Sequence, residues 1–310
     1  MRRTLSVTPA DEGNRIDAFV ARALPEVSRR LAKSLARDGH IRCGGRVVPG
    51  AHAVRAGDAV EVRIATDRAE AEVPTARVLH QNERFVYLYK PAGLHTVRLR
   101  PDDPPTLADV ARGVDPGCAD ASPDPRESGA LHRLDVSTSG VVAFARSAQA
   151  WREGRSAITG AWKLYLARAE QSAKVWPPTP SAHVRRHADA PRWPAGTLLD
   201  PPTEEGTRVT WPLASSGPRG RRVEVDEAGQ PAASRIWPLR AGGPVFAVEL
   251  LTGRRHQIRV HMASLGMPLA GDSEYGSAPG GAQVLLHAWA FQLEPTEPLI
   301  VAPAPAWSQS

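Results

Sequence analysis

Apolar residues near the N-terminus recur with the spacing of two short helices. In the first stretch they lie three or four positions apart: Ile16, Phe19, Val20 and Ala23. Pro25 ends this pattern, and after Ser28, a residue type that caps helices, a second set follows: Leu31, Ala32 and Leu35. Gly39 is placed to end the second helix.

Beyond residue 40 the apolar residues form short runs separated by turns, which predicts strands. The turn Gly44-Gly45 separates the runs 41–42 and 46–48, and the run 59–64 follows the turn Gly57-Asp58. Further runs lie at 78–80, 85–89, 141–145 and 163–167. The chain is therefore predicted to mix helices and strands, with strands dominating the longer C-terminal part.

The stretch 65–74 has mixed charge, small residues and no aromatic side chain, so it predicts a linker. A length of 310 residues suits two domains. We therefore expect one domain at 1–64, a linker at 65–75 and a second domain at 76–310. Two segments of the second domain, near 98–128 and 172–206, are rich in Pro, Asp and Gly or in Trp and Pro, and we expect irregular loops there.

Composition narrows the class of partner and the compartment. A net charge of +6 and a pI near 9.8 favour a polyanionic partner. The two cysteines, Cys43 and Cys118, match no metal-ligand spacing and form no disulfide framework, which suits a reducing compartment. The sequence lacks an apolar signal core and any stretch of membrane-spanning length, so we expect a soluble, cytoplasmic protein with no membrane partner.

Several cofactor and catalytic motifs are missing from the sequence. It contains no GxxxxGK phosphate loop, no GxGxxG fingerprint and no G-x-S-x-G elbow. His256 and His261 lie five positions apart, which matches neither a helical pair nor one face of a strand. We therefore expect no metal site.

One aspartate stands in an unusual local setting. In the segment LHRLDVSTSG, residues 131–140, Asp135 lies between an apolar arm and a turn of hydroxyl residues and glycine. The predicted strand 141–145 follows, so Asp135 would lie on a loop held by rigid structure, where chemistry is often found. Asp, Ser and Thr also hydrogen-bond their own backbone in turns, so the residues alone leave both interpretations open.

The motifs resemble those of a known enzyme family. HRLDVSTSG resembles the catalytic HRLD-x-x-TSG motif of the RluA-like pseudouridine synthases, whose aspartate, here Asp135, attacks the target uridine. The segments 90–94 (KPAGL), 252–261 (TGRRHQIRVH) and 271–276 (GDSEYG) resemble further family motifs. The resemblance runs from about residue 15 to 305. Arg255 departs from it, since the family commonly has a small hydroxyl residue at that position.

The resemblance implies a fold and a catalytic site. The fold is α+β, a pseudouridine synthase fold with a mainly antiparallel mixed sheet, preceded by a small α/β module resembling the RNA-binding domain of ribosomal protein S-four. In the active cleft Asp135, Tyr165 and Arg259 would meet. Tyr165 would stack on the flipped uracil, although a core tyrosine is the ordinary interpretation of its strand. Arg259 would be the ionic partner of Asp135, and a guanidinium can bind a carboxylate bidentately.

RNA contacts are expected in both domains. Arg29, Lys33 and Arg37 recur every four residues on one helix face, which is either a phosphate-binding face or merely a solvated one. In the second domain we expect contacts from five residues of the motifs: Arg133, Lys90, Arg254, His256 and Gln257. For Lys90, structural support of the motif loop is an equal alternative.

The implied function is isomerisation of uridine to pseudouridine in structured RNA, foremost large-subunit ribosomal RNA, with transfer RNA as another possible substrate. The reaction oxidises nothing and hydrolyses nothing overall, so we expect no cofactor. We expect a monomer. The alternative is a catalytically silent RNA-binding or ribosome-assembly factor of the same fold, and a weaker third candidate is a nucleoside hydrolase that uses the same aspartate.

Overall fold

The chain divides into two compact units, Met1–Glu72 and Val73–Ser310. The computed structural model describes residues 2–24, 27, 29–37, 39–63, 75–99, 104–170, 180–217, 222–240, 243–277 and 283–309. The expected linker, apart from Thr75, lies outside these residues, as do parts of both expected loop segments.

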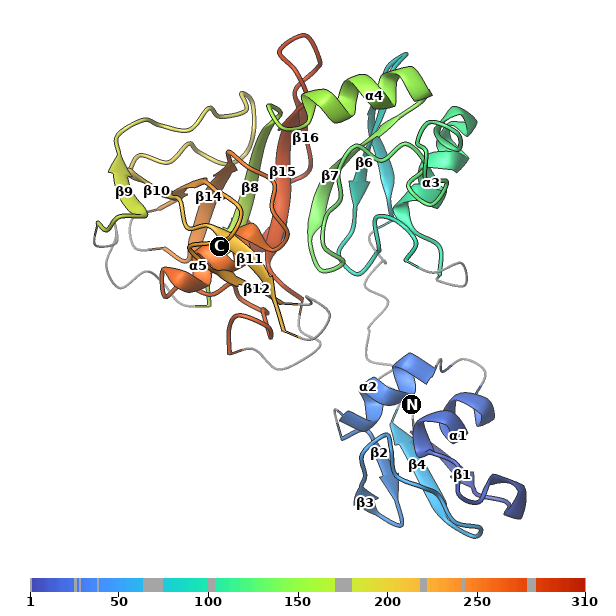
Figure 1. The fold of residues 1–310 in the computed structure, drawn as a ribbon. Helices are drawn as coiled ribbons and strands as arrows, with labels where there is room; N and C mark the ends of the chain where they lie inside the picture. The colour runs from blue at the N-terminus through green and yellow to red at the C-terminus, as the bar shows by residue number, and fades with distance from the viewer. Residues whose placement is uncertain are drawn as a thin grey trace. The chain divides into compact units, whose positions relative to one another are not determined.

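The first unit packs two helices on a small antiparallel sheet (Figure 1). The helices are α1 (Ile16–Ala23) and α2 (Arg29–Arg37), preceded by the 3-10 turn η1 (Pro9–Asp11). The sheet has the order β1-β4-β2-β3, from β1 (Arg2–Ser6), β2 (Ile41–Cys43), β3 (Arg46–Val47) and β4 (Ala59–Arg63). The buried core includes the apolar residues that predicted the helices, among them Ile16, Phe19, Val20, Ala32 and Leu35.

The strand β1 was not predicted. Its sequence, RRTLS, is short and mostly polar, so it lacks the apolar alternation that signals a strand. It forms because β4 offers it an antiparallel partner, with Leu5 opposite Val60.

A long mixed sheet forms the centre of the second unit. Its order is β5-β6-β7-β15-β8-β14-β13-β10-β9, with β16 pairing to β15. The strands are β5 (Arg77–Gln81), β6 (Phe85–Lys90), β7 (Ser139–Ala145), β8 (Trp162–Arg168), β9 (Val184–His187), β10 (Gly206–Val209), β13 (Ser234–Pro238), β14 (Val245–Leu250), β15 (Leu286–Gln292) and β16 (Ile300–Val301). Only the pair β7 and β15 is parallel among these described strands. The predicted α+β class with a mainly antiparallel sheet is confirmed.

Smaller elements flank this sheet (Figure 1). They are the helices α3 (Leu107–Val114), α4 (Ala148–Ala157) and α5 (Gln257–Ser264), the 3-10 turns η2 (Pro116–Cys118) and η4 (Ala306–Ser308), and the hairpin of β11 (Leu213–Ser216) and β12 (Arg222–Val225). Within the part of the chain that the structure describes, every helix is too short or too polar to cross a membrane.

The segment near 98–128 is more regular than predicted. It contains α3, whose Leu107, Ala108 and Ala111 are buried in one cluster with Val86 and Leu88 of β6. The carboxylate of Asp109 accepts the backbone N–H of Thr106 at 2.7 Å and so caps the helix. The prediction of an irregular loop is therefore wrong for 107–114. It missed the helical spacing because the surrounding Pro and Gly residues dominate the composition.

The start of β7 requires a glycine. Gly140 has a φ of +122° and pairs with Ala288 of the parallel strand β15. A Cβ at this position would overlap the carbonyl group of Ala288. The glycine that ends the 131–140 motif thus lets β7 approach β15 closely, immediately after the loop that carries Asp135.

Candidate active site

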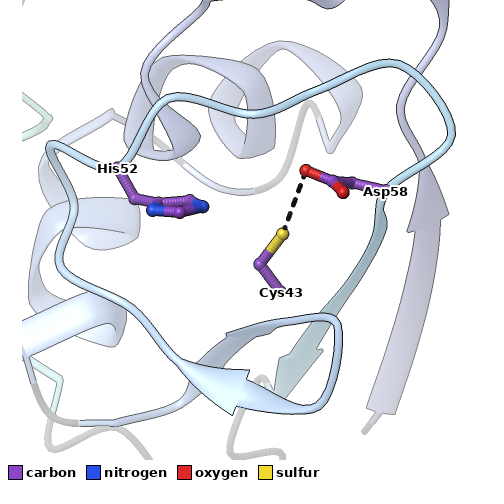
Figure 2. A group of neighbouring side chains, drawn as sticks. All are labelled: Cys43, His52 and Asp58. Carbon is purple, nitrogen blue, oxygen red and sulfur yellow. Dashed lines mark hydrogen bonds between the residues drawn. The ribbon is translucent and has the colours of Figure 1, made fainter.

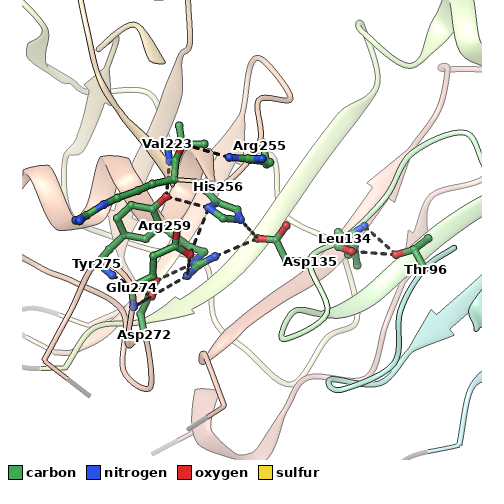
Figure 3. A network of polar contacts seen from close by, with 11 residues as sticks. Thr96, Leu134, Asp135, Val223, Arg255, His256, Arg259, Asp272, Glu274 and Tyr275 are labelled. Atoms are coloured by element: carbon green, nitrogen blue, oxygen red, sulfur yellow. Dashed lines mark hydrogen bonds and ion pairs between the residues drawn. The ribbon is translucent and has the colours of Figure 1, made fainter. Parts of the chain in front are cut away.

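Asp135 lies on the loop that enters β7, and this loop is anchored from both sides. Its backbone carbonyl accepts the N–H of Thr138 at 3.0 Å, which closes a turn. The neighbouring Leu134 exchanges two hydrogen bonds with the hydroxyl of Thr96, at 3.2 Å and 3.0 Å (Figure 3). The carboxylate side chain stays 29% exposed. The loop therefore presents an accessible carboxylate in a fixed position.

Lys90 supports this loop from inside the protein. It is fully buried, and its Nζ donates to the carbonyl oxygens of Pro91, Leu94 and Val136 at 3.0, 2.7 and 3.2 Å. Burial lowers the pKa of Lys90 to about 7, while the charge of Asp135 acts in the opposite direction. This burial contradicts the predicted RNA contact and favours the alternative, structural support of the motif loop.

Arg259 extends from α5 toward Asp135. Its Nη1 lies 3.6 Å from Oδ2 of Asp135. Nε and Nη2 each donate to Asp272 at 2.8 Å, and Nη2 also donates to Glu274 at 3.0 Å (Figure 3). The bidentate partner of Arg259 is thus Asp272, whereas Asp135 forms a single ion pair with it. Burial opposes the charge of Arg259, but the hydrogen bonds to Asp272 and the surrounding carboxylates raise its pKa overall.

His256 approaches the same carboxylate from the N-terminus of α5. Its backbone has a φ of +54°, in the left-handed region that few residues other than glycine adopt. Its Nε2 lies 3.8 Å from Oδ2 of Asp135, and its Nδ1 lies 2.9 Å from the hydroxyl of Tyr275 (Figure 3). Burial lowers the pKa of His256, partly offset by Asp135. Its Nδ1 also lies 3.6 Å from Oε2 of Glu274, so the strained backbone aims the ring between Asp135, Glu274 and Tyr275.

Tyr165 lies in β8 between two neighbouring strands, opposite Val248 of β14 and Ala288 of β15. Only 8% of its surface is exposed. Burial raises the pKa of its hydroxyl, and the negative charge of Asp135 raises it further. The tyrosine belongs to the buried core cluster that also contains Val248 and Ala288.

The remaining residues predicted to contact RNA differ in exposure. Gln257 is 2% exposed, and its side chain bonds to Thr252, Arg254, Ala233 and Ser234. These bonds use both ends of its amide to join the loop before α5 to β13, which contradicts a direct RNA contact. Arg133 and Arg254 are exposed.

Arg255, the residue that departs from the family pattern, is exposed next to the site. It donates to the backbone carbonyl of Arg222 at 3.2 Å. This contact holds its guanidinium at the start of β12.

Asp272, Glu274 and Tyr275 contribute to the site without having been predicted to do so. Asp272 is completely buried and also accepts the backbone N–H groups of Glu274 and Tyr275 at 3.0 and 3.2 Å. The motif at 271–276 pointed to this segment, but the residues themselves gave no indication that they would surround Arg259.

The predicted basic face of α2 is described in part. Arg29 and Lys33 are exposed, and Nε of Arg29 lies 3.8 Å from Oδ1 of the buried Asp17. The side chain of Arg37 lies outside the described residues. The two described cations thus share an accessible surface in the first unit.

Two family models match the chain. The model described as RNA pseudouridylate synthase matches residues 84–264, which include Asp135, Tyr165 and Arg259. The model of the S4 domain matches residues 14–60, within the first unit.

Curated relatives match over almost the whole length. Ribosomal large subunit pseudouridine synthase D of Xylella fastidiosa is 31% identical over 98% of this chain and 89% of its own. Ribosomal large subunit pseudouridine synthase C of Escherichia coli is 27% identical over 88% of this chain and 80% of its own. Among solved structures, human RNA Pseudouridylate Synthase Domain Containing 1 aligns with a TM-score of 0.51 at 20% identity, over 75% of this chain and 84% of its own, which is a likeness of fold.

Proposed function

Because the chain belongs to the RNA pseudouridylate synthase family, we propose that it converts specific uridines of large-subunit ribosomal RNA to pseudouridine, with Asp135 as the reacting group. The family makes the chain an RNA-modifying isomerase with an RNA-binding S4 domain. The choice of ribosomal RNA is supported by the names of its full-length relatives. The single observation that carries the role of Asp135 is its position 3.6 Å from the buried guanidinium of Arg259.

The reaction moves the glycosidic bond from one ring atom of the uracil to another. The bond between N1 of uracil and C1′ of ribose breaks, the base turns over, and C5 bonds to C1′, while C5 loses a proton and N1 gains one. Asp135 begins the reaction by one of two routes, attack on C1′ or removal of the proton on C2′. Both routes require an ionised carboxylate, which the nearby Arg259 favours.

Tyr165 and Arg259 take different parts in this proposal. The ring of Tyr165 provides a π-face on which the extruded uracil stacks, which offsets part of the cost of removing the base from the RNA. Arg259 keeps Asp135 charged and is itself oriented by Asp272.

The proposal extends to the partners and the location. Arg133 and Arg254 are exposed and contact RNA phosphates, as do Arg29 and Lys33 of the S4 domain. His256 touches the RNA at the reacting nucleotide. The reacting groups all come from one chain, so a monomer suffices, and ribosomal RNA as substrate implies action in the cytoplasm. The isomerisation has no net redox change, so it requires no cofactor.

The experiment maps pseudouridine in total RNA from cells that lack the protein. The same cells then receive either the wild-type chain or the Asp135→Asn variant, which has nearly the same shape but no charge. We expect discrete pseudouridines of large-subunit ribosomal RNA to disappear, and only the wild-type chain to restore them. Binding of Asp135→Asn to the same RNA should remain close to that of the wild type.

Each other outcome points to a different function. Loss of pseudouridine from transfer RNA alone would replace the proposed substrate. An unchanged map, with a ribosome-assembly defect that Asp135→Asn repairs, would favour the catalytically silent factor. Release of free uracil would indicate the hydrolase.

A further inference from the structure

Three side chains with metal-binding groups meet in the first unit, whereas the candidate active site belongs to the second. Cys43 ends β2, His52 lies in the loop between β3 and β4, and Asp58 immediately precedes β4 (Figure 2). Their donor atoms, one sulfur, one imidazole nitrogen and one carboxylate oxygen, all lie within 4.8 Å of one another. The fold thus assembles a group that the spacing in the sequence did not reveal.

The donor set is that of a zinc-type ion. Thiolate, imidazole and carboxylate are the three common protein ligands of Zn²⁺, whereas Mg²⁺ and Ca²⁺ prefer oxygen alone. Bonds of about 2.3 Å to sulfur and about 2.0 Å to oxygen at a tetrahedral centre put the two ligand atoms about 3.5 Å apart. In the structure Sγ of Cys43 and Oδ2 of Asp58 lie 3.3 Å apart. This edge of a tetrahedron is already formed, and the imidazole nitrogen of His52 lies within 4.8 Å of both atoms.

The surroundings hold two of the three ligands in place. Cys43 lies opposite Val60 of β4, and the following Gly44 donates its N–H to the carbonyl of Ala59 at 3.1 Å. Oδ2 of Asp58 accepts the backbone N–H of Arg55 at 2.8 Å, which orients the carboxylate as outer hydrogen bonds orient metal ligands elsewhere. All three residues are half-buried, so a cation can enter from solvent and keep a water ligand.

The thiol of Cys43 donates a hydrogen bond to Oδ2 of Asp58 at 3.3 Å. Burial, with a smaller contribution from Asp58, raises the pKa of the Cys43 thiol to about 11. A metal ion must therefore displace the thiol proton, and this cost weakens binding at low pH.

We propose that Cys43, His52 and Asp58 bind one divalent transition-metal ion of the zinc type, with water as the fourth ligand. The ion joins the end of β2 to the loop before β4 and so stabilises the RNA-binding unit against unfolding. This site is separate from the reaction at Asp135, and the proposal does not depend on the proposed function.

The experiment titrates the metal-stripped, reduced full-length chain with Co²⁺ and follows its absorption. A thiolate bound to Co²⁺ gives a charge-transfer band in the near ultraviolet, and a tetrahedral site gives intense visible bands. We expect saturation at one ion per chain and displacement by Zn²⁺ but not by Mg²⁺. Zn²⁺ should raise the temperature at which the first unit unfolds. Hydrogen exchange of the backbone amides of this unit measures that temperature.

Three variants assign the site. Cys43→Ser should lose the charge-transfer band, while Cys118→Ser, which removes the only other cysteine, should keep it. His52→Gln should weaken binding by at least about tenfold, because even residues that only orient a ligand contribute that much. Circular dichroism checks that each variant folds. If Cys43→Ser does not fold, the Co²⁺ affinity of His52→Gln tests the metal site by itself.

The proposal is overturned by any of three results. These are the absence of a thiolate band, a band that survives Cys43→Ser, or a Co²⁺ affinity that His52→Gln leaves unchanged. In each case the pair of Cys43 and Asp58 would be a hydrogen bond that only stabilises the turn.

Discussion

Asp272 holds Arg259 through two hydrogen bonds of 2.8 Å, and this leaves Nη1 of Arg259 directed at Asp135. Asp272 is completely buried and Arg259 nearly so. An arginine held in this way can stay charged beside Asp135 without being bound to it bidentately. The carboxylate of Asp135, the proposed reacting group, therefore stays accessible, with 29% of its side chain exposed.

Replacing Asp272 with Asn should reduce both stability and activity. The substitution keeps the volume but removes the charge that compensates buried Arg259, and breaking a buried pair in this way costs about 3–5 kcal/mol. Urea unfolding measures the stability. Turnover should fall more than RNA affinity does, because Asp272 positions Arg259 rather than RNA.

The control for this prediction is Asp124→Asn. Asp124 forms an exposed pair with Arg126, and surface pairs contribute little. Its unfolding and turnover should match the wild type. Equal unfolding midpoints for Asp272→Asn and the wild type would show that Asp272 does not hold Arg259.

The contribution of Tyr165 to the reaction rate should come from its ring and not from its hydroxyl. If uracil stacks on the ring, Tyr165→Phe keeps the π-face, whereas Tyr165→Leu loses about 1–3 kcal/mol of stacking. Leucine should therefore lower single-turnover rates by a factor of about 5–150, at 1.4 kcal/mol for each tenfold change. Phenylalanine should stay close to the wild type. A large loss with phenylalanine would instead implicate the hydroxyl.

Lys90→Met should loosen the loop of Asp135 without changing the contact with RNA phosphates. The variant removes the Lys90 donor from the carbonyl oxygens of Pro91 and Leu94, while that of Val136 keeps the N–H of Gly93, so turnover and stability should both fall. The salt dependence of RNA binding should remain that of the wild type. A smaller salt slope would return Lys90 to the set of phosphate contacts.

Lys90 also predicts a pH dependence of stability. Burial lowers its pKa to about 7 in the folded protein, whereas the pKa in the unfolded chain is about 10.4. Between these values the unfolded chain binds the extra proton, so this residue's contribution to folding becomes more favourable as pH rises. The difference in unfolding free energy between wild type and Lys90→Met should therefore widen from pH 7 to pH 9. A constant difference would contradict the lowered pKa.

Much of the fold could be predicted because apolar runs report burial directly. The strand 141–145, for example, is buried at every position. Contacts between side chains that are far apart in the sequence leave no comparable pattern. Nothing in the sequence distinguishes Asp272 from Asp135 as the bidentate partner of Arg259, because the choice depends on how the segment 271–276 folds back on α5. Lys90 was hard to assign for a related reason, since the same ammonium group can bind phosphate or backbone carbonyls, and only burial distinguishes the two.

The basic face of α2 should contribute to RNA affinity through phosphates alone. Arg29→Ala and Lys33→Ala should each reduce the slope of log affinity against log salt concentration by about 0.7 on single-stranded RNA, since each loses one phosphate contact. Arg37→Ala should behave in the same way.

The matched control is Arg126→Ala, which replaces an exposed arginine of the other unit and should leave the slope unchanged. Arg29 also lies 3.8 Å from Asp17, so its replacement removes an ion pair as well as a phosphate contact. The salt slope of Arg29→Ala is therefore compared with that of the wild type only if the two proteins melt at the same temperature. Equal slopes for all variants would make this face a solvated surface.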